Sequence, residues 1–186
     1  MRYSLINPTE FVQNNILGFY NIINLAKING IQKIFYASSS SVYGDSNNFP
    51  LKENQIIYPK NVYSLSKKNN EEMAEIFSQQ FSIKLVGLRF FTIYGEWGRP
   101  DMFLMKYLTS SFDRTKKFYL NNFGNHTRDF TYIIDACEII EKLLFSKKKQ
   151  LKHQILNICS NNPIKLLSII SELNRLTTKK PKIYRR

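Results

Sequence analysis

The clearest chemical pattern in this sequence of 186 residues is a tyrosine and a lysine at helical spacing, Tyr63 and Lys67. Residues four apart lie on one face of a helix, one turn from each other. A tyrosine hydroxyl has a reference pKa of about 10 and is a poor base at neutral pH, but a nearby ammonium favours its phenolate form. A pair of this kind can therefore take a proton from a hydroxyl group.

A run of serines upstream strengthens this interpretation. The apolar stretch from Ile34 to Ala37 reads as a buried strand, and four serines, Ser38 to Ser41, follow it directly. Open α/β sheets bind their ligands at the carboxyl ends of strands, so a serine there can bond a substrate hydroxyl and relay its proton to Tyr63. Taken singly, the serine run also fits a polar capping turn, and the Tyr-Lys pair fits an ordinary exposed helix. The combination of the two favours catalysis.

The elements that position these residues alternate between helix and buried strand. Apolar residues at helical spacing predict long helices over 8–29 and 63–81, and short apolar runs predict strands over 32–38 and 83–91. Strand, helix and strand at this spacing indicate right-handed βαβ units and a doubly wound parallel sheet.

Beyond residue 95 the expected elements are shorter, as in an α+β domain. They are helices over 102–113, 133–144 and 164–176 and strands over 118–120 and 154–159. We therefore predict an α/β protein in which residues 1–95 form part of a Rossmann-like sheet. Residues 96–186 are predicted to form most of a smaller, incomplete substrate-binding domain.

Composition narrows the class of protein. Hydrophobic residues make up 43% and charged residues 22%, which is ordinary for globular domains. The sequence has no apolar run of about 18 residues or more, which predicts no membrane span, and its start lacks the apolar core of a signal peptide. We expect a cytoplasmic protein in which Cys137 and Cys159 are reduced.

The net charge of +13 raises the question of a nucleic-acid partner. The basic residues are mostly lysines spread along the chain, with local excess at 147–149 and 179–186. Neither zinc-finger spacing nor an RNA-recognition signature accompanies them. We interpret them as a solvated surface, predict no nucleic-acid partner, and expect the charge to attract anionic ligands.

Four motifs occur along the chain in one order. They are Y-A-S-S-S-S-V-Y-G at 36–44, Y-S-L-S-K at 63–67, L-R-F-F-T-I-Y-G at 88–95 and R-D-F-T-Y-I-I-D at 128–135. In this order they resemble the extended short-chain dehydrogenase/reductase family of NAD-dependent epimerases and dehydratases. The segment 89–102 looks like UDP-glucuronate 4-epimerases in particular, and the resemblance extends over nearly all of the chain.

The resemblance implies catalytic and cofactor roles for residues of these motifs. Ser39, Tyr63 and Lys67 match the catalytic triad, with Tyr63 as general base and Lys67 orienting the ribose of NAD. Phe91 falls on the stretch that lies against the nicotinamide. Asn14, on the first helix, is expected to approach NAD, although a polar residue on a helix face is an equally good interpretation.

The resemblance also implies how a UDP-sugar is recognised. Ser40 and Ser41 fill positions where dehydratases of the family carry an Asp and a Glu, which argues against a dehydratase. Together with Thr92 their hydroxyls suit a C6 carboxylate. Arg99 and Arg128 match positions that face the diphosphate or the uronate, since a guanidinium fork binds phosphate or carboxylate bidentately. Exposed surface arginines are the alternative interpretation.

The function implied is epimerisation at C4 of a UDP-sugar, UDP-glucuronate to UDP-galacturonate, through a 4-keto intermediate and with no net redox change. Supply of polysaccharide precursors would be its role. Alternatives are another UDP-hexose epimerase or reductase of the family, or a non-catalytic remnant. The family also implies a homodimer formed through the helices at 8–29 and 63–81.

The sequence departs from the family at its beginning. A dinucleotide-binding sheet opens with a strand and a G-x-x-G-x-x-G turn, and none of the 7 glycines is arranged in this way. The resemblance begins only after roughly the first 85 to 90 residues of the family pattern, which include the glycine-rich turn. At 184–186 the sequence is expected to end before the last segments of the family's substrate domain. We therefore expect the chain alone to bind NAD poorly.

Overall fold

The structure is a computed structural model that describes residues 2–113, 115–146 and 152–186. The chain forms two compact units, the first of Met1–Phe91 with Phe145–Ile158 and the second of Thr92–Leu144 with Cys159–Arg186. We expected a boundary after residue 95. The first segment of the first unit ends at Phe91, and the later segment Phe145–Ile158 also belongs to that unit. The lysines at 147–149 lie outside the described residues.

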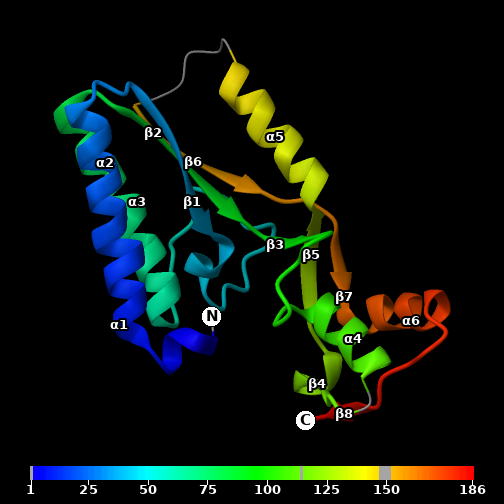
Figure 1. The fold of residues 1–186 in the computed structure, drawn as a ribbon. Helices are drawn as coiled ribbons and strands as arrows, with labels where there is room; N and C mark the ends of the chain where they lie inside the picture. The colour runs from blue at the N-terminus through cyan, green and yellow to red at the C-terminus, as the bar shows by residue number, and fades with distance from the viewer. Residues whose placement is uncertain (1, 114, 147–151) are drawn as a thin grey trace. The chain divides into compact units, whose positions relative to one another are not determined.

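The first unit is built on a parallel sheet (Figure 1). Its strands are β1 (Lys33–Ser39), β2 (Lys84–Phe90) and β6 (His153–Ile158), in the order β1–β2–β6. This confirms the α/β class and the parallel pairing. The helical segments are η1 (Arg2–Leu5), α1 (Pro8–Phe11), the π-helical η2 (Val12–Leu17), α2 (Gly18–Ile28), η3 (Ser40–Tyr43) and α3 (Val62–Phe81).

The two long helices pack on one face of this sheet. Ile23 of α2 and Ala74 of α3 form a single buried cluster with Tyr36 of β1 and Leu85 of β2. Burying such side chains contributes roughly 1.5–3 kcal/mol each for the larger ones. The packing therefore holds the middle of α3 against β1 and β2.

The second unit has two small sheets. β3 (Thr92–Tyr94) pairs parallel with β5 (Thr127–Tyr132), and β7 (Pro163–Lys165) pairs antiparallel with β5. β4 (Phe118–Leu120) pairs parallel with β8 (Ile183–Arg185). The remaining helical segments are α4 (Phe103–Phe112), η4 (Asn121–Gly124), α5 (Ile133–Phe145) and α6 (Leu166–Leu176).

Several details of the second unit differ from the prediction. Residues 164 and 165 were expected to begin a helix but lie in β7, and β3, β5 and β8 were not predicted as strands. β3 and β8 have three residues each, which is too short to show a period of two, and the six residues of β5 do not alternate regularly between buried and exposed. None of the helices among the described residues combines the length and apolar character that a bilayer crossing requires.

Candidate active site

The serine turn at the end of β1 is held in one conformation. Ser39 Oγ accepts hydrogen bonds from the backbone N–H of Ser41 at 3.2 Å and from Ser41 Oγ at 2.9 Å, which caps η3. At the other end Gly44 has a φ of +64°, and a Cβ there would lie 2.1 Å from the carbonyl oxygen of Tyr58. Only glycine fits at that position. The turn is therefore closely constrained at both ends, with Ser39 buried and Ser40 half-buried between them.

The start of α3 places the tyrosine and the lysine. Asn61 caps the helix, because its Oδ1 accepts from the N–H of Ser64 at 2.9 Å while Ser64 Oγ accepts from the N–H of Asn61 at 3.2 Å. Tyr63 then falls in the first turn and Lys67 in the second. Lys67 Nζ donates to the carbonyl oxygen of Ala37 at 3.0 Å, which ties the helix to the end of β1. Burial lowers the pKa of the Lys67 ammonium.

Tyr63 is half-buried beside the first helix. Its ring packs edge-on against Phe11, with the ring centres 6.0 Å apart. Within the described part of the chain, its hydroxyl makes no hydrogen bond to Ser39 or Lys67. Catalytic hydrogen bonds often tighten only when substrate is bound, so a direct Ser39–Tyr63 contact stays a prediction.

Asn15, which was not singled out from the sequence, is connected to the backbone of Tyr63 by two hydrogen bonds through Ser66. Asn14 is exposed in η2, and its role toward a cofactor stays a prediction. Its neighbour Asn15 donates through Nδ2 to Ser66 Oγ at 2.9 Å, and Ser66 Oγ donates to the backbone carbonyl of Tyr63 at 2.8 Å. The π-helical register of η2 decides which asparagine faces α3, and periodicity at 3.6 residues per turn cannot reveal it.

A buried ion pair lies under the serine turn and was also missed. Arg89 of β2 and Glu71 of α3 are 3% and 5% exposed and form two hydrogen bonds, Nε to Oε1 at 2.9 Å and Nη2 to Oε2 at 2.8 Å. Burial alone would lower the pKa of the arginine, but the bonds and charge of Glu71 outweigh it and raise that pKa. An arginine inside a predicted buried strand was the available signal, since buried charges require partners.

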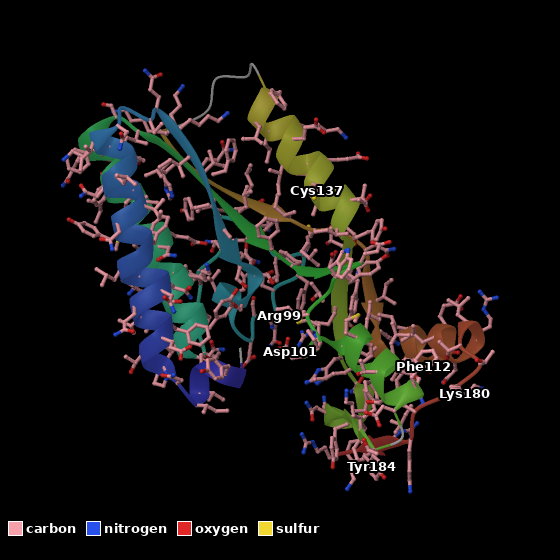
Figure 2. All side chains as sticks on the ribbon, in the orientation of Figure 1. Arg99, Asp101, Phe112, Cys137, Lys180 and Tyr184 are labelled. Atoms are coloured by element: carbon pink, nitrogen blue, oxygen red, sulfur yellow. The ribbon has the colours of Figure 1, made fainter. Side chains whose placement is uncertain are left out.

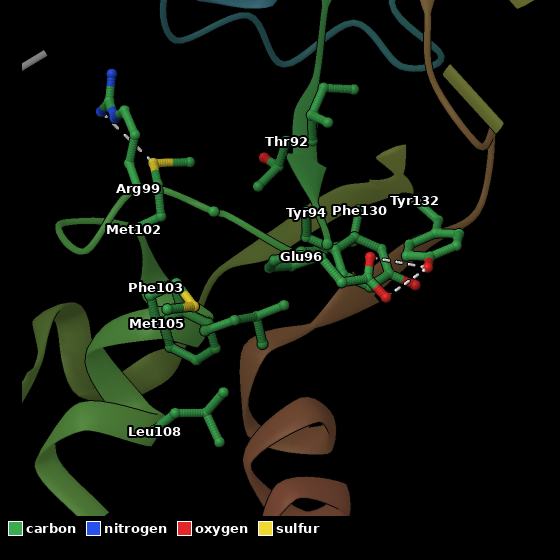
Figure 3. Close-up of a pocket in the computed structure, with 14 residues that line it drawn as sticks. Thr92, Tyr94, Glu96, Arg99, Met102, Phe103, Met105, Leu108, Phe130 and Tyr132 are labelled. Carbon is green, nitrogen blue, oxygen red and sulfur yellow. Dashed lines mark hydrogen bonds between the residues drawn. The ribbon is translucent and has the colours of Figure 1, made fainter. Parts of the chain in front are cut away.

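The second unit contains a cavity of about 280 Å³ (Figure 3). Thr92 of β3 and Arg99 of the loop before α4 both line it, so the structure brings these two predicted residues together. Aromatic and methionine side chains make up much of the remaining wall, and they include Tyr94, Met102, Phe103, Met105, Phe130 and Tyr132. A largely apolar wall with a few polar groups is typical of sites for small organic ligands.

Two exposed polar pairs border this cavity. Arg99 binds Asp101 through Nε–Oδ1 and Nη2–Oδ2 contacts of 2.9 Å each (Figure 2), and the hydrogen bond from Arg99 lowers the pKa of the aspartate. Tyr132 Oη donates to the two carboxylate oxygens of Glu96 at 3.0 and 2.9 Å, which raises the pKa of the tyrosine. An anionic ligand would compete with these carboxylates for the same donors.

The remaining predicted residues are placed as follows. Arg128 is exposed on β5, opposite Ile164 of β7, and is not among the residues that line the cavity. Phe91 ends the first unit, where its N–H donates to the carbonyl oxygen of Ile158 at 3.1 Å. Among the described residues, no group of three or more His, Cys, Asp or Glu could hold a metal ion.

Known proteins resemble the chain in sequence and in structure. An uncharacterized protein of Methanocaldococcus jannaschii is 39% identical over 183 residues, covering 98% of this chain and 55% of the relative. UDP-glucuronate 4-epimerase 2 of Arabidopsis thaliana is 35% identical over 197 residues, covering 98% of this chain and 45% of the relative. The chain thus spans about half the length of the curated relatives that it matches.

A solved structure and a family model agree with these relatives. The UDP-glucuronic acid 4-epimerase from Bacillus cereus, solved with UDP-glucuronic acid and NAD, superposes with a TM-score of 0.86 at 29% identity, covering 94% of this chain and 55% of that one. The model of the NAD dependent epimerase/dehydratase family matches residues 1–159. Since that match takes in most of the chain and all four motifs begin within it, the chain belongs to the NAD dependent epimerase/dehydratase family.

Proposed function

We propose that this chain carries the catalytic and sugar-recognition residues of an NAD-dependent UDP-sugar 4-epimerase, and that its substrate is UDP-glucuronate. The observation that carries the proposal is the junction of β1 and α3. There Lys67 is bonded to the carbonyl oxygen of Ala37, two residues before the buried Ser39, and Tyr63 lies one helical turn before Lys67. Family membership supports the reaction class, and relatives named UDP-glucuronate 4-epimerases support the substrate.

The donor set around Lys67 suits the ribose of NAD. An ammonium carries three N–H donors, and the bond to Ala37 uses one of them. The others suit the ribose hydroxyls, with Phe91 and Asn14 proposed to border the cofactor. When bound there, NAD would supply the hydride acceptor and donor for C4 of the sugar.

The chain's own residues handle the proton. Tyr63 is proposed to take the proton of the C4 hydroxyl and to give it back after the keto sugar has turned over in the site. Ser39 Oγ accepts both of its bonds from Ser41, so its own hydrogen stays available to hold the substrate oxygen. General base catalysis of this kind contributes typically about 10²- to 10⁴-fold.

Selection of a uronate is proposed to rest on hydroxyls and on arginine. Ser40 and Ser41 are half-buried at the serine turn, and Thr92 lines the cavity beside Arg99. Hydroxyl donors and a guanidinium stabilise a carboxylate. Arg128 is proposed to contact the diphosphate.

A second copy of the chain is proposed as partner, through the helices at 8–29 and 63–81. These helices leave large apolar side chains exposed, including Leu17 at 54%, Leu25 at 57%, Leu65 at 48% and Ile76 at 52%. Apolar surface of this extent is typical of an interaction face. Sedimentation of the chain tests this directly, since a monomer at micromolar concentration would contradict it.

The test of the function is the substitution Tyr63→Phe in a version of the protein that carries the glycine-rich cofactor motif, assayed with UDP-glucuronate and NAD. We expect turnover to be lost while UDP-sugar binding changes less than about twofold, because only the proton acceptor is removed. Tyr58→Phe, the same change at an exposed loop tyrosine, should leave turnover intact. Substantial residual turnover in Tyr63→Phe would sink the assignment, and net consumption of NADH would indicate a reductase instead.

A further inference from the structure

A chain of polar side chains lies between the first sheet and α3, directly beneath the serine turn. We call it the Glu71–Arg89 network; its members are Ser38, Tyr43, Glu71, Arg89 and Asn157. The first four are at most 5% exposed, and Asn157 is half-buried. The ion pair at its centre is bidentate, so it fixes the orientation of both side chains as well as their distance.

The network holds both ends of the serine turn. Ser38, which precedes Ser39, donates its hydroxyl to Glu71 Oε1. Tyr43, which ends η3, accepts from Arg89 Nη1 at 2.9 Å through its hydroxyl oxygen. One buried ion pair therefore reaches the residue before the turn through its carboxylate and the residue at the end of the turn through its guanidinium.

The same network holds the loop that follows. Tyr43 Oη donates to Asn157 Oδ1 at 2.7 Å, and Asn157 Nδ2 donates to the carbonyl oxygen of Leu51 at 3.0 Å. Arg89 Nη1 also donates to the carbonyl oxygen of Glu53 at 3.1 Å. The backbone at 51–53 is thus bonded to the groups that hold the serine turn.

Stability alone is a weak reason for such an arrangement. Taking two charges out of water costs several kcal/mol per ion, and well-packed apolar residues of similar size are often as stabilising. What a bidentate pair adds is a defined geometry. Here the geometry is transmitted to Ser39 and Ser41, whose hydroxyls bond each other at 2.9 Å.

We propose that Glu71 and Arg89 are positioning residues for the serine turn, and that they act through Ser38 and Tyr43. The catalytic consequence rests on the proposed function, whereas the structural part does not. Catalysis is sensitive to displacements of about 1 Å in the groups that hold the substrate. A loosened network therefore misaligns Ser39 without removing it.

The decisive variant is Tyr43→Phe, which removes one hydroxyl and keeps the buried ring. Tyr36→Phe is its matched control, because Tyr36 is also buried on the α3 face but its hydroxyl bonds Nε2 of His153 at 3.1 Å. In the full chain we expect hydrogen exchange at 39–44 and 51–55 to become about five- to tenfold faster in Tyr43→Phe, because the lost hydroxyl bonds both Arg89 and Asn157. The control should leave both segments unchanged. Unchanged exchange in Tyr43→Phe overturns the proposal.

Turnover gives a second readout that a purely structural role would not move. We expect Tyr43→Phe to lower kcat about tenfold, with KM for UDP-glucuronate changed less than about threefold, and Tyr36→Phe to change neither. Equal kcat values in the two variants would overturn the positioning role. If a version of the protein that carries the glycine-rich cofactor motif shows no turnover without substitution, the proposed function fails, while the exchange comparison still decides whether the network holds the turn. Ser38→Ala repeats the exchange test from the other end, should Tyr43→Phe fail to fold.

Discussion

The two units hold the same kind of contact in opposite surroundings. In the first unit Arg89 and Glu71 form a bidentate pair whose side chains are 4% and 6% exposed. In the second, Arg99 and Asp101 form a pair of the same geometry, with side chains 65% and 60% exposed. A buried pair fixes what surrounds it, because breaking it strands a charge. An exposed pair can exchange one partner for a ligand at little cost. The contrast suggests that the first unit holds the proposed catalytic groups rigidly, whereas the second leaves the proposed binding groups available.

The largest expected effect tests this contrast directly. Arg89→Ala leaves the carboxylate of Glu71 buried without its partner, and we expect the free energy of unfolding to fall by about 3–5 kcal/mol. Arg99→Ala deletes an arginine side chain at an exposed position, and it should lower the free energy of unfolding by no more than about 1 kcal/mol. Urea unfolding followed by circular dichroism measures both. Equal losses would remove the distinction between the two units.

A second comparison concerns glycines with left-handed backbone. Gly44→Ala places a Cβ 2.1 Å from the carbonyl oxygen of Tyr58, and we expect a loss well above the cost of about 1–2 kcal/mol for the backbone conformation alone. In the second unit Gly124→Ala meets only leucine side chains, at 2.7 Å, which can shift. Gly30→Ala, at a φ of +66° with open space around it, measures the conformational cost. A loss at Gly44 no larger than at Gly30 would contradict the steric argument.

Asp129, in the second unit, is hydrogen-bonded on both carboxylate oxygens, so its loss should destabilise the fold as loss of a buried contact in the first unit does. Asp129 accepts hydrogen bonds from Thr131 Oγ1, from the N–H and hydroxyl of Ser160, and from the N–H of Asn162, all at 2.9–3.0 Å. In Asp129→Asn one oxygen becomes a donor that faces another donor, so we expect a loss of about 1–3 kcal/mol in thermal or urea unfolding. Glu96→Gln, where one exposed tyrosine is the partner, should cost less. The opposite order would show that these bonds contribute little.

The smallest expected effect is a pH dependence in the first unit. Burial lowers the pKa of His153, despite the opposing charges of Glu75 and Glu71. An unfolded histidine titrates near about 6.5, so below that pH the unfolded chain binds more protons than the folded one. Stability should therefore fall as the pH drops through about 6.5 and level off below the folded pKa. His153→Gln should flatten this part of the curve when urea unfolding is followed as a function of pH, and an unchanged curve would contradict the prediction.

Sequence patterns predicted the long elements and the residues attached to them. The helices at 8–29 and 63–81 and the strands around 33–39 and 84–90 carry enough periodic apolar residues to be recognised. Tyr63 and Lys67 were singled out by their helical spacing and Ser39 by the family resemblance, and their catalytic roles stay predictions. The family resemblance assigned substrate contacts to Thr92 and Arg99, which both line the cavity of the second unit, and that role stays a prediction.

What the sequence concealed depends on pairing at a distance. β3, β7 and β8 have three residues each, so their identity comes from their partners rather than from their own pattern. The π-helical register that turns Asn15 toward α3 has no local marker. Glu71 and Arg89 are 18 positions apart, and only the packing of α3 on β2 shows that they meet.

The place of β6 has a consequence for how the protein is made. β2 pairs with β1 on one edge and with β6 on the other, yet residues 91–152 are synthesised between β2 and β6. On the ribosome, β1 and β2 can pair as soon as they emerge, while the second edge of β2 waits on the order of several seconds for its neighbour at typical elongation rates. Asn157 arrives with that last strand, so the contacts it makes with Tyr43 and Leu51 are completed only then. An open strand edge is a template for pairing with other chains, and the nascent protein carries this one throughout the interval.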